Sequence, residues 1–139
     1  MTAKLLTVFA FFSVFFVTLP AVGMPFEKGE NSLPKGWTLY GKIGPGSIRC
    51  EDGGAVRITD SSGSDETGLS RIFPLEAGGG KYEIAIDAEP LPGSTLEGAL
   101  IQLRALPSGK FAFKPLVKGT TTVGLDIPAG SDRAQVFIW

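Results

Sequence analysis

The chain contains no histidine and a single cysteine, and these absences exclude much of the chemistry used by small enzymes. Without an imidazole there can be no Ser-His-Asp triad, no Cys-His pair and no histidine base. One thiol supports neither a thiolate zinc site nor an internal disulfide bond. The phosphate-binding pattern Gly-x-x-x-x-Gly-Lys-Ser/Thr is also missing. The glycine run Gly78–Gly80 precedes an expected strand, so no helix N-terminus follows it to bind phosphate.

The chain also lacks an excess of charge, with 13 basic and 14 acidic residues and a formal net charge of −1. No segment forms a basic patch, so nucleic acid is not an expected partner. The lone thiol of Cys50 lies between Arg49 and Glu51, in a pattern typical of a strand. We expect it to be buried as a small hydrophobe, and the alternative is a thiol available for intermolecular pairing.

The first 23 residues have the pattern of a secretory signal peptide. Lys4 supplies a positive charge, an apolar run with five phenylalanines follows, and small residues surround Gly23. Cleavage after Gly23 would remove 23 of 139 residues and leave 116, enough for one domain (24–139), with Lys4 lost and a net charge of −2. The alternative is a membrane anchor, because the run is about long enough to span a bilayer. We expect a secreted, periplasmic or cell-envelope protein that is free of the membrane after cleavage.

Beyond residue 24, short alternating segments are separated by turns rich in glycine and proline. In segment 82–89, apolar residues at even positions alternate with mostly charged residues at odd positions. This period of two is typical of a strand with one buried and one wet face. Segment 98–106 repeats it, with Ile101 and Leu103 alternating with Gln102 and Arg104. The pair predicts two antiparallel strands with the core on one side.

Similar patterns predict further strands at 37–43, 47–51, 55–60, 69–75, 120–127 and 133–139. Segment 110–114 also alternates and is either a short strand or the lip of a loop. About eight strands with turn signals between them, and no convincing helix after residue 23, favour an all-β sandwich or barrel. Asp52-Gly53-Gly54 predicts a hairpin turn. The polar segment 61–68 does not have the ligand spacing of an EF-hand, so we expect a solvated loop there.

Several of these motifs resemble galactose-binding-like jelly rolls, including families 4 and 9 of the carbohydrate-binding modules. The resemblance rests on Phe26-Glu27, on Pro34-x-Gly-Trp37 before the first full strand, and on the acidic residue and glycine turn of 76–80 before Lys81-Tyr82. It covers most of the chain after Met24 and implies a jelly-roll β-sandwich of antiparallel strands. It also implies a closing strand with an aspartate pair after segment 133–139. Since the sequence stops at Trp139, either the sandwich closes without that strand or the chain is a piece of a larger protein.

Sugar recognition needs a flat aromatic ring against the pyranose and polar side chains around its hydroxyl groups. The candidate carbohydrate-binding residues are Tyr40, Arg57, Gln102, Arg104, Phe137 and Trp139. Phe137 and Trp139 alternate with Val136 and Ile138, which predicts two rings on the wet side of the last strand. Either they form a sugar platform, or they pack against a further strand or a neighbouring domain. A solvated face is the default interpretation of the polar candidates, and Trp37 and Tyr82 are expected in the core.

Two further sets of carboxylates are candidates for a metal site or for catalysis. The resemblance implies a structural calcium ion away from the sugar, for which Glu27 matches one ligand position and Asp52 is expected nearby. Calcium takes about six to eight oxygen ligands. Asp87 and Glu89 lie two residues apart on one strand face, at about 6.5–7 Å. They allow a hydrolase or lyase hypothesis, although a strand's wet face carries such charges by default.

Together these features predict a secreted, non-catalytic carbohydrate-binding domain, acting alone or as the accessory part of a larger enzyme. Its expected partner is a polysaccharide or glycan, and structural calcium is the one cofactor suggested. The alternative is a structural or protein-interaction β-sandwich of the cell envelope.

Overall fold

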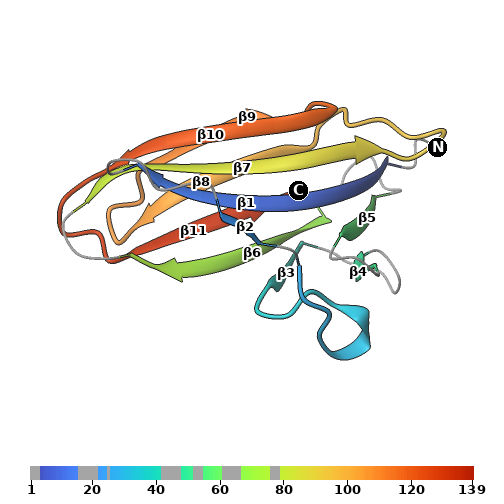
Figure 1. The fold of residues 1–139 in the computed structure, drawn as a ribbon, viewed down its shortest axis with the longest axis horizontal. Helices are drawn as coiled ribbons and strands as arrows, with labels where there is room; N and C mark the ends of the chain where they lie inside the picture. Colours follow the sequence, from blue (N-terminus) through green and yellow to red (C-terminus); the bar gives the residue numbers. More distant parts are fainter. Residues whose placement is uncertain are drawn as a thin grey trace.

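The computed structural model describes residues 4–15, 22–24, 26–41, 48–51, 55–60, 67–75 and 79–139. Within these ranges the chain forms eleven strands and one short 3-10 helix, η1 (Glu30–Ser32). The strands make two antiparallel sheets whose apolar faces share one core (Figure 1). The prediction of an all-β fold built from antiparallel strands is therefore confirmed.

The first sheet has the order β10-β7-β1-β5-β4, with β2 paired beside β1. Its strands are β1 (Lys4–Phe15), β2 (Val22–Met24), β4 (Ile48–Cys50), β5 (Val56–Asp60), β7 (Gly80–Pro90) and β10 (Gly119–Ile127). The second sheet has the order β3-β6-β11-β8-β9. Its strands are β3 (Thr38–Gly41), β6 (Thr67–Pro74), β8 (Leu100–Leu106), β9 (Phe111–Pro115) and β11 (Arg133–Ile138).

The alternation in the sequence decides which side of each strand is buried. In β7, Ile84 and Ile86 are completely buried, whereas Glu83 and Asp87 on the other side are half-buried. The inward residues predicted for the other alternating strands are buried as well: Val56, Ile58, Val123, Leu125, Ile127, Val136 and Ile138. Removing these side chains from water is the main favourable term in joining the two sheets.

The two strands with the clearest alternation are both present, but they do not pair with each other. β7 lies between β10 and β1, whereas β8 lies between β11 and β9 in the opposite sheet. Segment 91–99 therefore crosses from one sheet to the other. The sequence could not show this, because a hairpin and a crossover between sheets both use turn residues such as Pro92 and Gly93.

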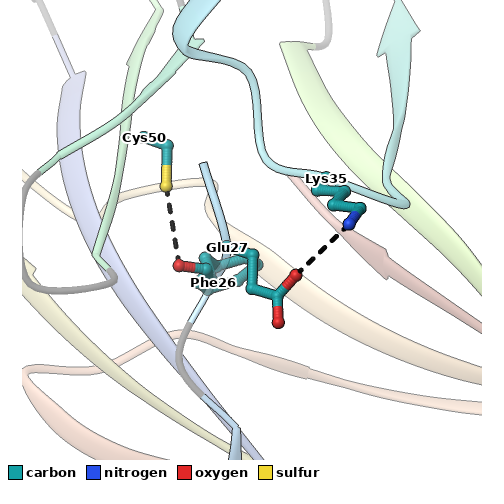
Figure 2. A network of polar contacts seen from close by, with 4 residues as sticks. All are labelled: Phe26, Glu27, Lys35 and Cys50. Atoms are coloured by element: carbon teal, nitrogen blue, oxygen red, sulfur yellow. Dashed lines mark hydrogen bonds and ion pairs between the residues drawn. The ribbon is translucent and has the colours of Figure 1, made fainter. Parts of the chain in front are cut away.

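A cluster of aromatic rings and the thiol close one end of the core. The ring of Trp37 lies 5.3 Å from that of Phe26 and 6.2 Å from that of Phe73, measured between centroids. Trp37 and Tyr82 pack against the core, as predicted. Cys50 is 2% exposed, and its thiol lies 3.7 Å from the carbonyl oxygen of Phe26 (Figure 2). The prediction of a buried cysteine is confirmed.

The segment predicted as a signal peptide contributes a central strand to the first sheet (Figure 1). The β1–β7 register runs from Leu6 opposite Pro90 to Phe15 opposite Lys81. On its other side, β1 pairs with β5 over residues 4–8. Cleavage after Gly23 would remove β1 and so separate β5 from β7; that cleavage stays a prediction. Among the described residues, no helix is long and apolar enough to span a membrane.

The sequence of β1 explains why it was not predicted as a strand. Residues 5–15 are apolar at both even and odd positions, so they lack the period of two that β7 shows. At even positions the register sets Ala10 opposite the buried Ile86. At odd positions it sets Phe9 opposite Asp87. A continuous apolar run of this kind is typical of a leader as much as of a strand.

Removing the first 23 residues should change the first sheet and spare the second. Amide hydrogens of β5 and β7 that point toward β1 would lose their partners, so we expect them to exchange faster in a chain beginning at Met24 than in the full chain. Amides of β8 and β11 serve as the internal control. Hydrogen exchange followed by mass spectrometry or NMR measures both. Equal protection of β5 and β7 in the two chains would contradict the placement of β1.

Core packing can be tested with two isoleucines of opposite exposure. Ile86 is completely buried, whereas Ile72 is 49% exposed on the outer side of β6. We expect Ile86→Ala to lower the free energy of unfolding by about 2–5 kcal/mol, and Ile72→Ala to lower it by less than about 1 kcal/mol. Urea denaturation of both variants makes the comparison, and similar losses would argue against this arrangement of the core.

Candidate functional site

The outer side of the second sheet brings together four residues singled out in the sequence. On β11 and β8, Phe137 stands opposite Gln102, and Gln135 stands opposite Arg104. Residues directly opposite each other in an antiparallel pair project to the same side of the sheet. Trp139 follows Phe137 by two residues, and their rings meet edge to face with centroids 6.3 Å apart. Two aromatic and three polar side chains therefore share one side of β8 and β11.

The edge strand β9 extends this surface with two further rings. Phe113 stands opposite Gln102, and Phe111 stands opposite Arg104. The two phenylalanine rings are 6.4 Å apart and inclined by 26°, close to parallel. Phe111 is 50% and Phe113 54% exposed. We call the following seven residues the aromatic face: Gln102, Arg104, Phe111, Phe113, Gln135, Phe137 and Trp139.

Arg104 occupies the middle of the aromatic face and is held there by its neighbours. Its Cζ atom lies 5.6 Å from the ring centroid of Phe111 and 5.4 Å from that of Phe137, within the range of cation–π attraction. Its Nη2 donates a hydrogen bond of 3.3 Å to Oε1 of Gln102. Its Nε is buried and has no hydrogen-bond partner among the described residues. The guanidinium is thus fixed in position while several of its N–H donors stay uncommitted.

The arrangement suits a ligand with flat apolar faces and a polar rim. Exposed rings offer a surface for stacking, and the amide of Gln102 and the guanidinium of Arg104 offer oriented hydrogen bonds beside it. Gln102 is only 8% exposed, so packing limits its conformations. Groups that are fixed before binding lose less entropy when a ligand arrives.

The other two carbohydrate-binding candidates lie away from this cluster. Tyr40 is on β3, at the far edge of the same sheet, where it pairs with Gly68 of β6. Its side chain is outside the described residues. Arg57 lies on β5 in the first sheet, where its Nε is 2.8 Å from Oε1 of Glu51. The structure therefore brings together Gln102, Arg104, Phe137 and Trp139, and it leaves Arg57 on the opposite sheet.

Sequence reasoning missed the contribution of Phe111 and Phe113. The segment Lys110-Phe-Ala-Phe-Lys114 showed the alternation of a strand, which already sets both rings on one side. The alternation could not show which strand pairs with this segment. The pairing of β9 with β8 depends on the tertiary fold, and it sets the two rings opposite Gln102 and Arg104.

The predicted calcium ligands do not form a site within the described part of the chain. Glu27 is exposed, and its Oε2 is 3.9 Å from Nζ of Lys35 (Figure 2). Asp52 lies outside the described residues. Those residues contain no group of three or more side chains of the kinds that hold metals. Calcium takes about six to eight oxygens, so Glu27 alone would not hold the ion, and structural calcium stays a prediction.

The two carboxylates of the hydrolase hypothesis have separate partners on the outer side of the first sheet. Asp87 accepts a hydrogen bond from the hydroxyl of Thr120. An Oε1 atom of Glu89 lies 4.0 Å from Nζ of Lys118. Both contacts are of the kind made on a solvated strand face, on the sheet opposite the aromatic face. They give the hydrolase hypothesis no support.

Comparisons of the chain with protein-family models, with curated proteins and with solved structures find no match in any of the three. The aromatic face is therefore the observation from which a function has to be inferred.

The end of β11 depends on a close approach to Gly68. A Cβ atom at this position would collide with the carbonyl oxygen of Ile138 and would lie 2.7 Å from Cβ of Trp139. Any larger residue would push the end of β11 away from β6 and move the ring of Trp139. Glycine at this position thus helps to set the shape of the aromatic face.

We expect Gly68→Ala to lower the free energy of unfolding by about 1–3 kcal/mol through overpacking, and to alter the fluorescence of Trp139. Gly124→Ala is the matched control, because a Cβ there would have its nearest neighbour at 3.5 Å, an ordinary contact. Chemical denaturation followed by tryptophan emission measures both. Unchanged stability and emission in the Gly68 variant would show that this approach is not tight.

Proposed function

We propose that this chain is a non-catalytic carbohydrate-binding domain and that glycans bind along the aromatic face. The observation that carries the proposal is the pair of exposed, nearly parallel rings of Phe111 and Phe113 beside the hydrogen-bonded pair Gln102–Arg104. A pyranose presents C–H groups on its faces and hydroxyl groups around its rim. Rings can stack on the former while the amide and the guanidinium bond the latter.

We also propose a jelly-roll fold of the galactose-binding-like kind. Two antiparallel sheets around one core agree with it, as does the resemblance of segments 25–37 and 69–82 to modules of families 4 and 9. The leader-like pattern of residues 1–23 supports export, either as a separate protein or as the accessory part of an enzyme. A domain that holds its linked partner on a polysaccharide needs no catalytic groups of its own.

The expected affinity is modest, because few side chains of the face can contact one sugar at a time. Dissociation constants from micromolar to millimolar correspond to about −8 to −4 kcal/mol. A polysaccharide that spans several strands would gain by contacting more of the face at once. This sets the concentration range in which binding has to be measured.

The first experiment is a depletion assay with a panel of soluble and insoluble polysaccharides, using the full chain after a check of cooperative unfolding. We expect Phe113→Ala to weaken binding by about threefold to tenfold, because its ring is 54% exposed and its loss should leave the fold intact. Val117→Ala is the control, since Val117 is similarly exposed but lies outside the aromatic face. Equal binding by the two variants would contradict a role for the rings.

A protein-interaction sandwich of the cell envelope is the second candidate, because exposed rings are also what a protein partner would cover. Competition separates the two. Soluble sugar should release a glycan-binding domain from its partner and leave a protein-binding domain in place. A well-folded chain that no polysaccharide depletes would favour this second candidate.

A further inference from the structure

The charges of the sandwich are divided between its two outer sides. Among its side chains, the aromatic face contains one cation, Arg104, and no acidic residue. The outer side of the first sheet carries both signs. Its carboxylates on β7 and β10 are Glu83, Asp87, Glu89 and Asp126, and its cations are Arg49, Arg57 and Lys81. A nearly neutral chain thus presents a local positive charge where its rings are exposed. Such a charge attracts anions to this side in preference to the other.

The surroundings of Arg104 differ from those of the other arginines with a described polar partner. Arg57 has Glu51 at 2.8 Å, and Arg133 has Asp132 at 3.0 Å. Arg104 instead has two rings and the neutral amide of Gln102. A guanidinium is almost never fully buried unless it is paired, and that of Arg104 is half-buried with its Nε enclosed. In the described part of the chain no carboxylate pairs with Arg104, so a ligand could supply one.

We propose, resting on the carbohydrate-binding function above, that the ligand is an acidic glycan and that a uronate carboxylate binds the guanidinium of Arg104. Since Nε is buried, the carboxylate would accept hydrogen bonds from the terminal Nη groups. A planar carboxylate matches the planar guanidinium in a two-bond pair, the strongest contact an arginine makes with an anion. The uronate ring, or its neighbour in the polymer, would stack on Phe111 and Phe113.

The contact between Gln102 and Arg104 orients the guanidinium for such a ligand. The hydrogen bond from Nη2 to Oε1, together with the rings on either side, holds the guanidinium where it is. It uses only one donor and adds no charge, so it orients the cation without neutralising it. A carboxylate in the place of Gln102 would orient the cation equally well but would repel an anionic ligand.

The test compares two polymers that share a sugar and a linkage and differ in charge. Polygalacturonate and its fully methyl-esterified form are titrated into the full chain by calorimetry, and alginate and its ester form a second pair. We expect the acid form of at least one pair to bind at least about tenfold more tightly than the ester. Added salt should reduce this preference, because it screens the attraction.

Two matched variants locate the effect. Arg104→Gln keeps hydrogen-bonding capacity without the charge, and it should remove the preference for the acid form. Arg57→Gln makes the same change on the opposite sheet and should keep the preference. If Arg104→Gln fails to unfold cooperatively, the comparison of polymers and its salt dependence with the unaltered chain still decides the proposal.

Each other outcome is decisive. Equal binding of acid and ester forms, or binding of neutral polysaccharides alone, would overturn the acidic ligand and leave the carbohydrate-binding function standing. A preference for the acid form that survives in Arg104→Gln would overturn the assignment of the carboxylate to Arg104. Tighter binding of a sulfated polysaccharide of equal charge density would overturn the carboxylate assignment. Binding of no polysaccharide, acidic or neutral, would overturn the proposed function and this inference with it.

Discussion

The packing of two alternating apolar faces against each other is the constraint on which the rest of this structure depends. Ile84 and Ile86 of β7 belong to the same buried core as Val136 and Ile138 of β11. Because side chains in a strand alternate, burying one side of β8 and β11 obliges their remaining residues to point outward. The position of Gln102, Arg104 and Phe137 on one surface is therefore a consequence of the core. A one-residue slip of either strand would exchange its core side for its outer side, and it would disrupt both the core and the aromatic face.

Much of this could be predicted from the sequence, because the period of two is local. Most strands after residue 24, their inward residues and the outward position of Phe137 and Trp139 follow from alternation, and the structure agrees with them. The buried state of Cys50 follows in the same way. The sequence does not show which strands pair with each other, since pairing joins segments that are far apart in the chain. That is why β7 and β8 were expected as one antiparallel pair, and why the rings of β9 were not assigned to the site.

In the first sheet, the sequence pattern and the structure assign different roles to residues 4–15. Residues 4–15 have the composition of a leader, yet in the structure they lie between β5 and β7 as a central strand. Apolar residues stand at both even and odd positions of this segment, a pattern typical of a leader as much as of a strand. The aromatic face lies on the other sheet, so the geometry of Arg104 and its rings does not involve β1.

The most direct test of the account is an NMR titration of the isotope-labelled chain with a short oligogalacturonate. If a glycan binds the aromatic face, chemical-shift changes should concentrate in β8, β9 and β11, and the side-chain signal of Arg104 should move with them. Changes confined to β7 and β10, on the opposite sheet, would contradict the account. So would a saturable interaction that leaves Arg104 and the rings of Phe111 and Phe113 unaffected.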